Sequence, residues 1–205
     1  FQVHIAESES SSYEQFRTKF SFEDKTRFDY WKRVSFTKDQ WRQIKCYCEK
    51  LELEFLASPF SIEAVELLEE IGVNCYKIGS AEFHDSLILH KVAKTGKPIF
   101  LSTGLSDLSE IDSTLDFLSN YNNQIVLFQC TTSYPTSPQN IGLNLIGDFI
   151  KRYNLPVGFS DHSGEIYPNL AAVVLGAQYL EFHVVFDKKM FGPDSRSSLT
   201  FHQVD

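Results

Sequence analysis

The chain of 205 residues is 42% hydrophobic and 22% charged, which is typical of one folded domain with a sizeable core and unlike a disordered protein. Its 19 basic and 27 acidic residues give a net charge of −8, and their scattered placement argues against nucleic acid or an anionic membrane as partner. With no run of about 18 apolar residues and no secretion signal, we expect a cytoplasmic protein without a membrane span. Cys46, Cys48, Cys75 and Cys130 lack the spacing of zinc ligands, and we interpret them as reduced structural thiols.

The predicted elements begin with a strand over Phe1 to Ile5. The polar, aromatic and acidic stretch from Glu7 to Thr37 follows, and we expect it to be a long loop with a helical insertion. From Leu53 onward, short apolar runs alternate with amphipathic stretches, as in repeated βα units on a parallel sheet. The further predicted strands cover residues 54–59, 75–80, 98–103, 125–130, 156–161 and 179–185. Helical spacing covers residues 38–52, 61–71, 85–94, 108–119, 141–152 and 167–175.

Seven strands with parallel connections point to an α/β fold of the (β/α)8 TIM-barrel class. The chain starts without Met, in a segment that already resembles the end of a strand. We therefore expect residues 1–205 to form a single partial TIM-barrel domain that lacks its first strand and helix.

Polar side chains follow every predicted strand, and two of them are histidines at the ends of successive strands. His162 and His183 are 21 positions apart and would lie on the same rim of a parallel barrel, where they could share a metal ion. The alternative is that each is a hydrogen-bonded structural histidine. Lys77 lies inside an apolar run, so it needs a partner, either in the barrel mouth or in a structural salt bridge.

Seven segments along the chain carry a resemblance to a known family. They are Ala57-Ser-Pro-Phe-Ser61, Tyr76-Lys-Ile-Gly-Ser-Ala-Glu82, Gly96-Lys-Pro-Ile-Phe-Leu-Ser-Thr-Gly104, Cys130-Thr-Thr-Ser-Tyr-Pro-Thr136, Gly158-Phe-Ser-Asp-His162, Gly176-Ala-Gln-Tyr-Leu-Glu-Phe-His183 and Gly192-Pro-Asp194. With these segments in order, the chain resembles the sialic acid synthase family, the synthases of N-acetylneuraminate and other nonulosonic acids. The resemblance implies a (β/α)8 barrel and condensation of phosphoenolpyruvate with N-acetylmannosamine or a related N-acetylated amino sugar, with release of phosphate.

The resemblance also implies roles for individual residues. His162 and His183 would bind a divalent metal, typically Mn²⁺, with Mg²⁺ or Co²⁺ as alternatives. Phosphoenolpyruvate would be bound by Lys77, Ser80, Ser102, Thr132 and Ser160, although each Ser or Thr by itself could be a helix N-cap. Gln2, Tyr134 and Asp194 match positions that contact the sugar. The implied catalytic carboxylates are Glu82, which would orient or deprotonate water, and Asp194, which would lie close to the metal.

Several departures from the family pattern limit this transfer of roles. A catalytic Glu and a substrate-binding Lys of the family would precede Phe1, and Phe182 and Ser195 replace a usual basic residue and a usual His. The C-terminal antifreeze-like domain of the family is absent from the sequence. We therefore expect the fragment as given to be inactive and its parent to be a homodimeric synthase.

Two other functions remain open. A metal-dependent TIM-barrel hydrolase would need a His-x-His pair on an early strand, whereas His4 stands alone there. The other alternative is an inactive barrel fragment without an independent role.

Overall fold

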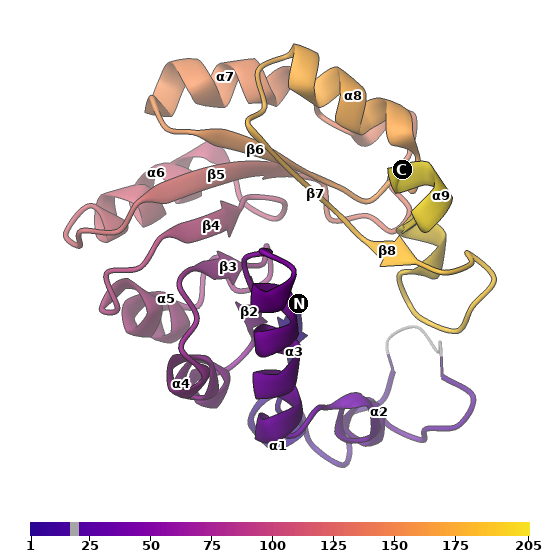
Figure 1. Cartoon of the computed structure of the whole chain (residues 1–205). Coiled ribbons are helices and arrows are strands. Elements are labelled where there is room, and N and C mark those ends of the chain that lie inside the picture. The colour runs from indigo at the N-terminus through magenta and orange to yellow at the C-terminus, as the bar shows by residue number, and fades with distance from the viewer. Residues whose placement is uncertain (17–20) are drawn as a thin grey trace. The chain divides into compact units, whose positions relative to one another are not determined.

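A computed structural model describes residues 1–16 and 21–205 of the chain (Figure 1). It divides into two compact units that are each discontinuous in sequence. Unit 1 comprises residues 1–78, 84–99 and 118–124, and unit 2 comprises residues 79–83, 100–117 and 125–205. No helix within residues 1–16 and 21–205 is long and apolar enough to cross a membrane.

Unit 1 contains short parallel strands and the helices that follow them. The strands are β1 (Gln2–Val3), β2 (Ser58–Pro59) and β3 (Tyr76–Ile78). Strand β1 pairs with β2 with Gln2 opposite Ser58, and Ala57 forms a parallel bridge with Tyr76. The helices are α1 (Ala6–Glu9), α2 (Arg27–Val34), α3 (Lys38–Lys50), α4 (Ile62–Ile71) and α5 (Ser86–Ala93).

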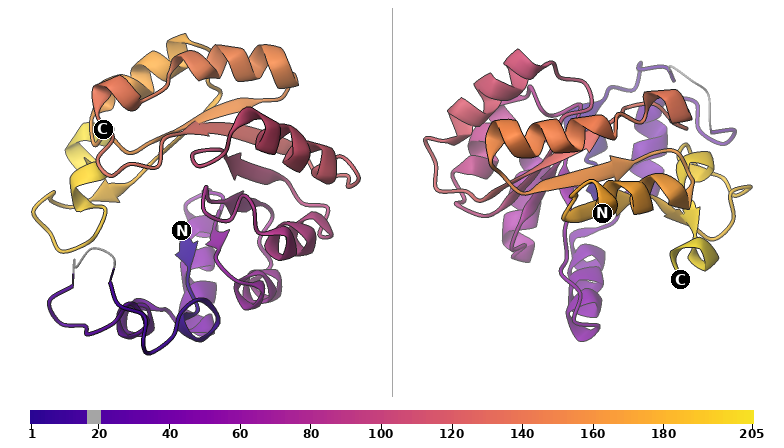
Figure 2. Two further views of the ribbon diagram at one scale, coloured as in Figure 1. Left: turned by 180° about the vertical axis from the view of Figure 1, so that it is seen from behind. Right: turned by 90° about the horizontal axis from the view of Figure 1, so that it is seen from above.

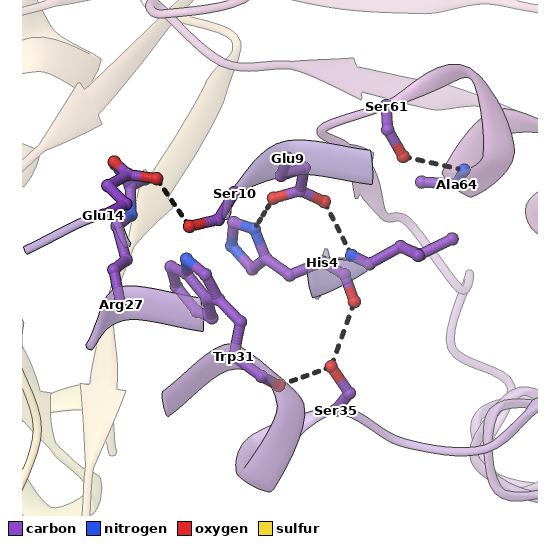
Figure 3. Close-up of polar contacts among 10 residues, drawn as sticks. His4, Glu9, Ser10, Glu14, Arg27, Trp31, Ser35, Ser61 and Ala64 are labelled. Carbon is purple, nitrogen blue, oxygen red and sulfur yellow. Dashed lines mark hydrogen bonds and ion pairs between the residues drawn. The ribbon is translucent and has the colours of Figure 1, made fainter. Parts of the chain in front are cut away.

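Local capping explains why the helices of unit 1 begin where the sequence predicts. The Thr37 side chain accepts a hydrogen bond from the Gln40 amide and forms a capping box at the start of α3. Ser61 Oγ accepts from the Ala64 amide at 3.1 Å and starts α4 (Figure 3). Helix α4 ends at Gly72, whose φ of 81° is the left-handed conformation that glycine adopts without strain.

The long loop after β1 is organised around the ring of His4. This ring stacks between Trp31 and Phe60, with centroid distances of 3.7 and 4.0 Å. Its Nδ1 lies 2.6 Å from a carboxylate oxygen of Glu9 (Figure 3). Helix α2 confirms the helical insertion expected between Glu7 and Thr37, of which residues 17–20 lie outside the described residues.

Unit 2 contains a parallel sheet with the strand order β4-β5-β6-β7. These strands are β4 (Ile99–Ser102, in unit 2 from Phe100), β5 (Ile125–Cys130), β6 (Val157–Asp161) and β7 (Tyr179–Phe182). Helix α6 (Leu108–Leu118) follows β4, while α7 (Asn144–Tyr153) and α8 (Ile166–Val174) lie side by side along one face of the sheet (Figures 1 and 2). Val157 and Phe159 are buried on this helix-covered face.

The single strand predicted over residues 179–185 is wrong in its length. It is interrupted at His183, so that β7 is followed by a separate β8 (Val184–Val185). Strand β8 pairs in parallel with β9 (Leu199–Thr200), and the Leu199 amide donates to the His183 carbonyl at 2.8 Å. The chain pairs with β6 up to Phe182 and with β9 from Val184 onward. His183 therefore lies between two regular strands. Short helices η1 (Pro138–Asn140), η2 (Ser195–Ser197) and α9 (Phe201–Val204) complete unit 2.

The other predicted strands and helices are present, with shorter ends in several cases. Only Ser58–Pro59 of the predicted strand 54–59 is a regular strand. The alternation of parallel strands and helices confirms the α/β class. The absence of a first strand and helix stays a prediction.

Candidate active site

The register of unit 2 places alternate side chains of neighbouring strands at the same level. Cys130 on β5 lies opposite Ser160 on β6, and Ser160 lies opposite Glu181 on β7. Because strand side chains alternate between faces, His162 and His183 continue the face of Ser160 and Glu181 by one further step. The opposite face of β6 is turned to α8, since Asn169 donates to Asp161 at 3.1 Å. The two histidines therefore lie on the face away from the helices.

Four of the predicted site residues come together here, the two histidines with Tyr134 and Asp194. The His162 and His183 ring centroids are 5.4 Å apart. The Tyr134 ring lies 4.2 Å from His162 and 6.0 Å from His183. An oxygen of the Asp194 carboxylate is 3.9 Å from His183 Nδ1. The side chains come from the loops after β5, β6 and β8 and from the end of β7.

Hydrogen bonds orient the His162 ring. Its Nδ1 lies 3.0 Å from the Thr131 carbonyl oxygen, and because a carbonyl can only accept, Nδ1 carries a proton. The Thr136 amide donates to the His162 carbonyl at 2.9 Å and ties the loop after β5 to the end of β6. The other ring nitrogen, Nε2, lies 3.2 Å from the Tyr134 hydroxyl. Nε2 is therefore the atom that His162 presents to a ligand.

The environment shifts the pKa of all three ring side chains. Burial lowers the pKa of His162, but the hydrogen bonds and charge interactions with Cys130, Thr131 and Glu181 together outweigh it, so the pKa lies above its ordinary value. Burial lowers the pKa of His183, an effect that Asp194 opposes and His162 reinforces, and the net shift is downward. Burial also raises the pKa of Tyr134, with negative charge nearby adding to the shift. Tyr134 consequently stays a protonated hydrogen-bond donor at neutral pH.

A second group of polar atoms surrounds the backbone of Gly104. The Gly104 amide donates to Ser80 Oγ at 3.0 Å, and Ser80 Oγ lies 3.5 Å from Cys130 Sγ. A Cβ at position 104 would meet Thr132 Oγ1 at 2.4 Å and Ser80 Oγ at 2.7 Å, so only glycine lets these hydroxyls approach the chain. Ser80 and Thr132, predicted from different strands to bind the same substrate, are thus neighbours in the structure.

A scan against family models matches the description NeuB family over residues 1–205. The chain belongs to the NeuB family.

Named relatives and a solved structure agree with this assignment. The chain is 38% identical to the N,N'-diacetyllegionaminic acid synthase of Campylobacter jejuni, over 77% of this chain and 48% of the relative. It is 33% identical to the human N-acetylneuraminate-9-phosphate synthase, over 85% of this chain and 49% of the relative. The crystal structure of N-acetylneuraminic acid synthetase from Leptospira borgpetersenii, in complex with citrate, superposes with a TM-score of 0.82 at 30% identity, covering 84% of this chain and 61% of that one. The chain spans about half the length of the curated relatives it matches.

The remaining predicted residues of this NeuB-family chain lie in several places. Ser102 and Ser160 are buried, and Ser160 Oγ donates to Glu181 at 2.7 Å. Glu82 contributes to the raised pKa of Tyr134. Gln2 and Lys77 belong to unit 1, where Gln2 is exposed on β1 and Lys77 is buried with its Nζ 3.2 Å from the Ile78 carbonyl oxygen.

Two residues that contact the predicted site residues were absent from the predicted set. Glu181 accepts from Ser160, and its position two residues before His183 in the predicted strand 179–185 could have indicated that both side chains point to the same face. Cys130 was predicted only as a structural thiol, yet its Sγ lies 3.5 Å from Ser80 Oγ and 4.0 Å from His162 Nδ1. No local signal distinguishes such a thiol from any other cysteine in a buried strand.

The donor atoms around His162 can be compared with the needs of a divalent metal. Within residues 1–16 and 21–205, no group of three or more His, Cys, Asp and Glu side chains is arranged to hold a metal ion. Two imidazoles alone, those of His162 and His183, would leave most of the ligand positions of an ion to water and substrate. This open donor set fits a catalytic metal better than a closed structural one.

Proposed function

We propose that the full-length protein carrying this chain condenses phosphoenolpyruvate with an N-acetylated amino sugar, N-acetylmannosamine or a relative, to give a nonulosonic acid and phosphate. The observation that carries this proposal is the convergence of His162, His183, Tyr134 and Asp194 in one place. Membership of the NeuB family supports the same reaction class. The proposal includes a cytoplasmic location and a homodimeric parent.

In the proposed reaction, C3 of phosphoenolpyruvate attacks the aldehyde carbon of the open-chain sugar, whose oxygen takes a proton. The oxygen of water adds to C2, and the C–O bond to phosphate then breaks to leave a ketone and inorganic phosphate. The protein has to hold two anionic groups of phosphoenolpyruvate, align the aldehyde with C3, and handle the proton lost by water.

His162 and His183 would hold a divalent metal, Mn²⁺ by preference and Mg²⁺ or Co²⁺ as alternatives. Such an ion, when bound, supplies Lewis-acid polarisation of a carbonyl oxygen. His162 suits the role because its Nδ1 proton is engaged by Thr131, so that Nε2 is the nitrogen that would bind the ion in place of its present contact with the Tyr134 hydroxyl. The downward shift in the pKa of His183 favours the neutral imidazole that ligation requires.

The hydroxyl groups near Gly104 suit the phosphoenolpyruvate anion. Ser80 and Thr132 are neighbours there, and we assign Ser102, Ser160 and the ammonium of Lys77 to the same substrate. The buried Ser102 would donate to the anion with little competition from water, and Ser160 would do so on releasing its present acceptor, Glu181.

Tyr134, Asp194 and Gln2 are assigned to the amino sugar. The phenol of Tyr134 remains protonated and can donate, and the Asp194 carboxylate can accept from a sugar hydroxyl. Glu82 is assigned to the water that adds to C2, as the group that orients it or takes its proton. Nothing in the described part of the chain favours the hydrolase alternative.

The test is phosphate release by the full-length protein with Mn²⁺, phosphoenolpyruvate and a panel of N-acetylated amino sugars. We expect turnover with at least one sugar, and a loss of at least about 100-fold in kcat/KM for His162→Ala and His183→Ala. The exposed His202→Ala is the matched control and should keep wild-type turnover. Absence of phosphate release with every sugar, or unchanged turnover of His162→Ala, would contradict the proposal.

A further inference from the structure

The segment that carries Asp194 is anchored to the loop after β6 at both of its ends. We call residues 186–198 the Asp194 loop. Near its start, Lys188 Nζ donates to the carbonyl oxygen of Gly164 at 2.5 Å. Gly164 follows His162 by two residues, so the anchor joins the segment bearing Asp194 to the segment bearing His162.

The far end of the Asp194 loop packs on the same glycine. A Cβ at Gly164 would meet the Arg196 carbonyl oxygen at 2.6 Å and the Ser197 carbonyl carbon at 3.3 Å. The φ of Gly164 is +72°, which L side chains rarely adopt. Both the available space and the backbone conformation therefore require glycine here.

Asp194 lies between these two anchored ends. Its carbonyl oxygen accepts from the Ser197 amide at 2.9 Å and from Ser198 Oγ at 2.8 Å. These bonds turn the chain so that the carboxylate lies 3.9 Å from His183 Nδ1. The position of this carboxylate thus depends on a loop that contacts Gly164 near both of its ends.

We propose that Lys188 is a positioning residue, which together with Gly164 clamps the Asp194 loop so that Asp194 faces the amino-sugar substrate beside His162 and His183. This inference rests on the proposed function. A long ammonium side chain suits the role because it can reach across to a backbone carbonyl and form a charge-assisted hydrogen bond. Loss of the clamp would displace Asp194 without removing any group that touches substrate.

The test replaces Lys188 by Met in the full-length protein, with Lys189→Met as the control. Lys189 is adjacent and exposed, and the two variants lose the same charge. We expect Lys188→Met to raise KM for the amino sugar about tenfold or more, while KM for phosphoenolpyruvate stays within about twofold. Lys189→Met should match the wild type, and Lys188→Arg, which keeps a charged donor, should recover part of the loss.

A second measurement does not depend on activity. Hydrogen–deuterium exchange of residues 190–198 should become faster in Lys188→Met but not in Lys189→Met. Gly164→Ala approaches the same contact from the other side and should give the same selective rise in KM. Lys188→Gln, which leaves Gly164 in place, keeps the test decisive if Lys188→Met fails to fold.

Unchanged exchange in Lys188→Met, equal effects of the two Met variants, or equal rises in both KM values would overturn the clamp. A wild-type protein that releases no phosphate would instead contradict the proposed function, and the exchange data would still decide whether Lys188 holds the loop.

Discussion

The four cysteines show how the surroundings of a side chain set its chemistry. Cys46 is exposed and Cys48 half-buried on α3, whereas Cys75 and Cys130 are buried. Burial, with the negative charge of Glu54 adding to it, raises the pKa of the Cys75 thiol to about 11. Because the thiolate is the nucleophile, the buried Cys75 thiol is unreactive near neutral pH, although its side chain is chemically the same as that of the exposed Cys46.

We predict that iodoacetamide at pH 8 modifies Cys46 and Cys48 long before Cys75. With a pKa of about 11, only about one Cys75 in a thousand is a thiolate at this pH. Peptide mass spectrometry after timed alkylation measures the order, and the same reaction in denaturant is the control in which all sites should react. Equal rates for Cys46 and Cys75 in the native protein would show that the prediction is wrong.

Single residues of the site could be predicted where a motif names them. His162, His183, Tyr134 and Asp194 were all predicted from sequence, and the structure brings them together. Glu181 was missed because its importance comes from the pairing of β6 with β7, which places it next to Ser160. The anchor of Lys188 on Gly164 depends on two loops meeting in space, and nothing near Lys188 in the sequence indicates it.

At the scale of elements, helices were predicted more closely than strands. Helix α3 begins after Thr37 and α4 begins after Ser61, since each start carries a local capping signal. The interruption between β7 and β8 could not be predicted, because β8 is defined by pairing with residues 199–200 farther along the chain. The local hydrophobic pattern indicates which residues are buried, whereas the residue at which a strand ends depends on the neighbouring strand it pairs with.

Two glycines, one in a helix and one in a strand, give an opposed pair of predictions. Gly147 lies in α7 with open space where a Cβ would be, so Gly147→Ala should stabilise the protein by up to about 1 kcal/mol. Gly158 lies in β6, and its Cβ would meet ring atoms of Phe128 at 2.5 to 2.7 Å. Gly158→Ala should therefore destabilise by about 1 to 3 kcal/mol. Urea denaturation measures both changes, and shifts of the same sign would refute this reasoning.

For the whole molecule, the repeating order of strands and helices was predictable because each repeat carries its own apolar pattern. The grouping into two units was not, since each unit is assembled from segments distant in sequence. The completion of an eight-stranded barrel and the single-domain organisation stay predictions. The family assignment depended on seven short motifs in order, and the family match over residues 1–205 confirms it.

Metal binding should appear as a stability change of the whole molecule. An ion at 100 times its dissociation constant stabilises the native state by about 2.7 kcal/mol, which raises the Tm by several degrees, and by less the longer the chain. We predict this rise for the full-length protein on addition of Mn²⁺, and its loss in His162→Ala. The His202→Ala control should respond like the wild type. An equal response of His162→Ala would place the ion elsewhere.

The alternation of side chains along β6 has a consequence for how such proteins diverge. Ser160 and His162 face the site, whereas Phe159 and Asp161, their immediate neighbours, belong to the side that packs against helices. Substitutions at positions 160 and 162 would therefore alter the site, whereas substitutions at positions 159 and 161 would alter the contacts with the helices. Because neighbouring positions of β6 face opposite sides, the polar groups of the site can be replaced one at a time without removing the side chains that pack against the helices.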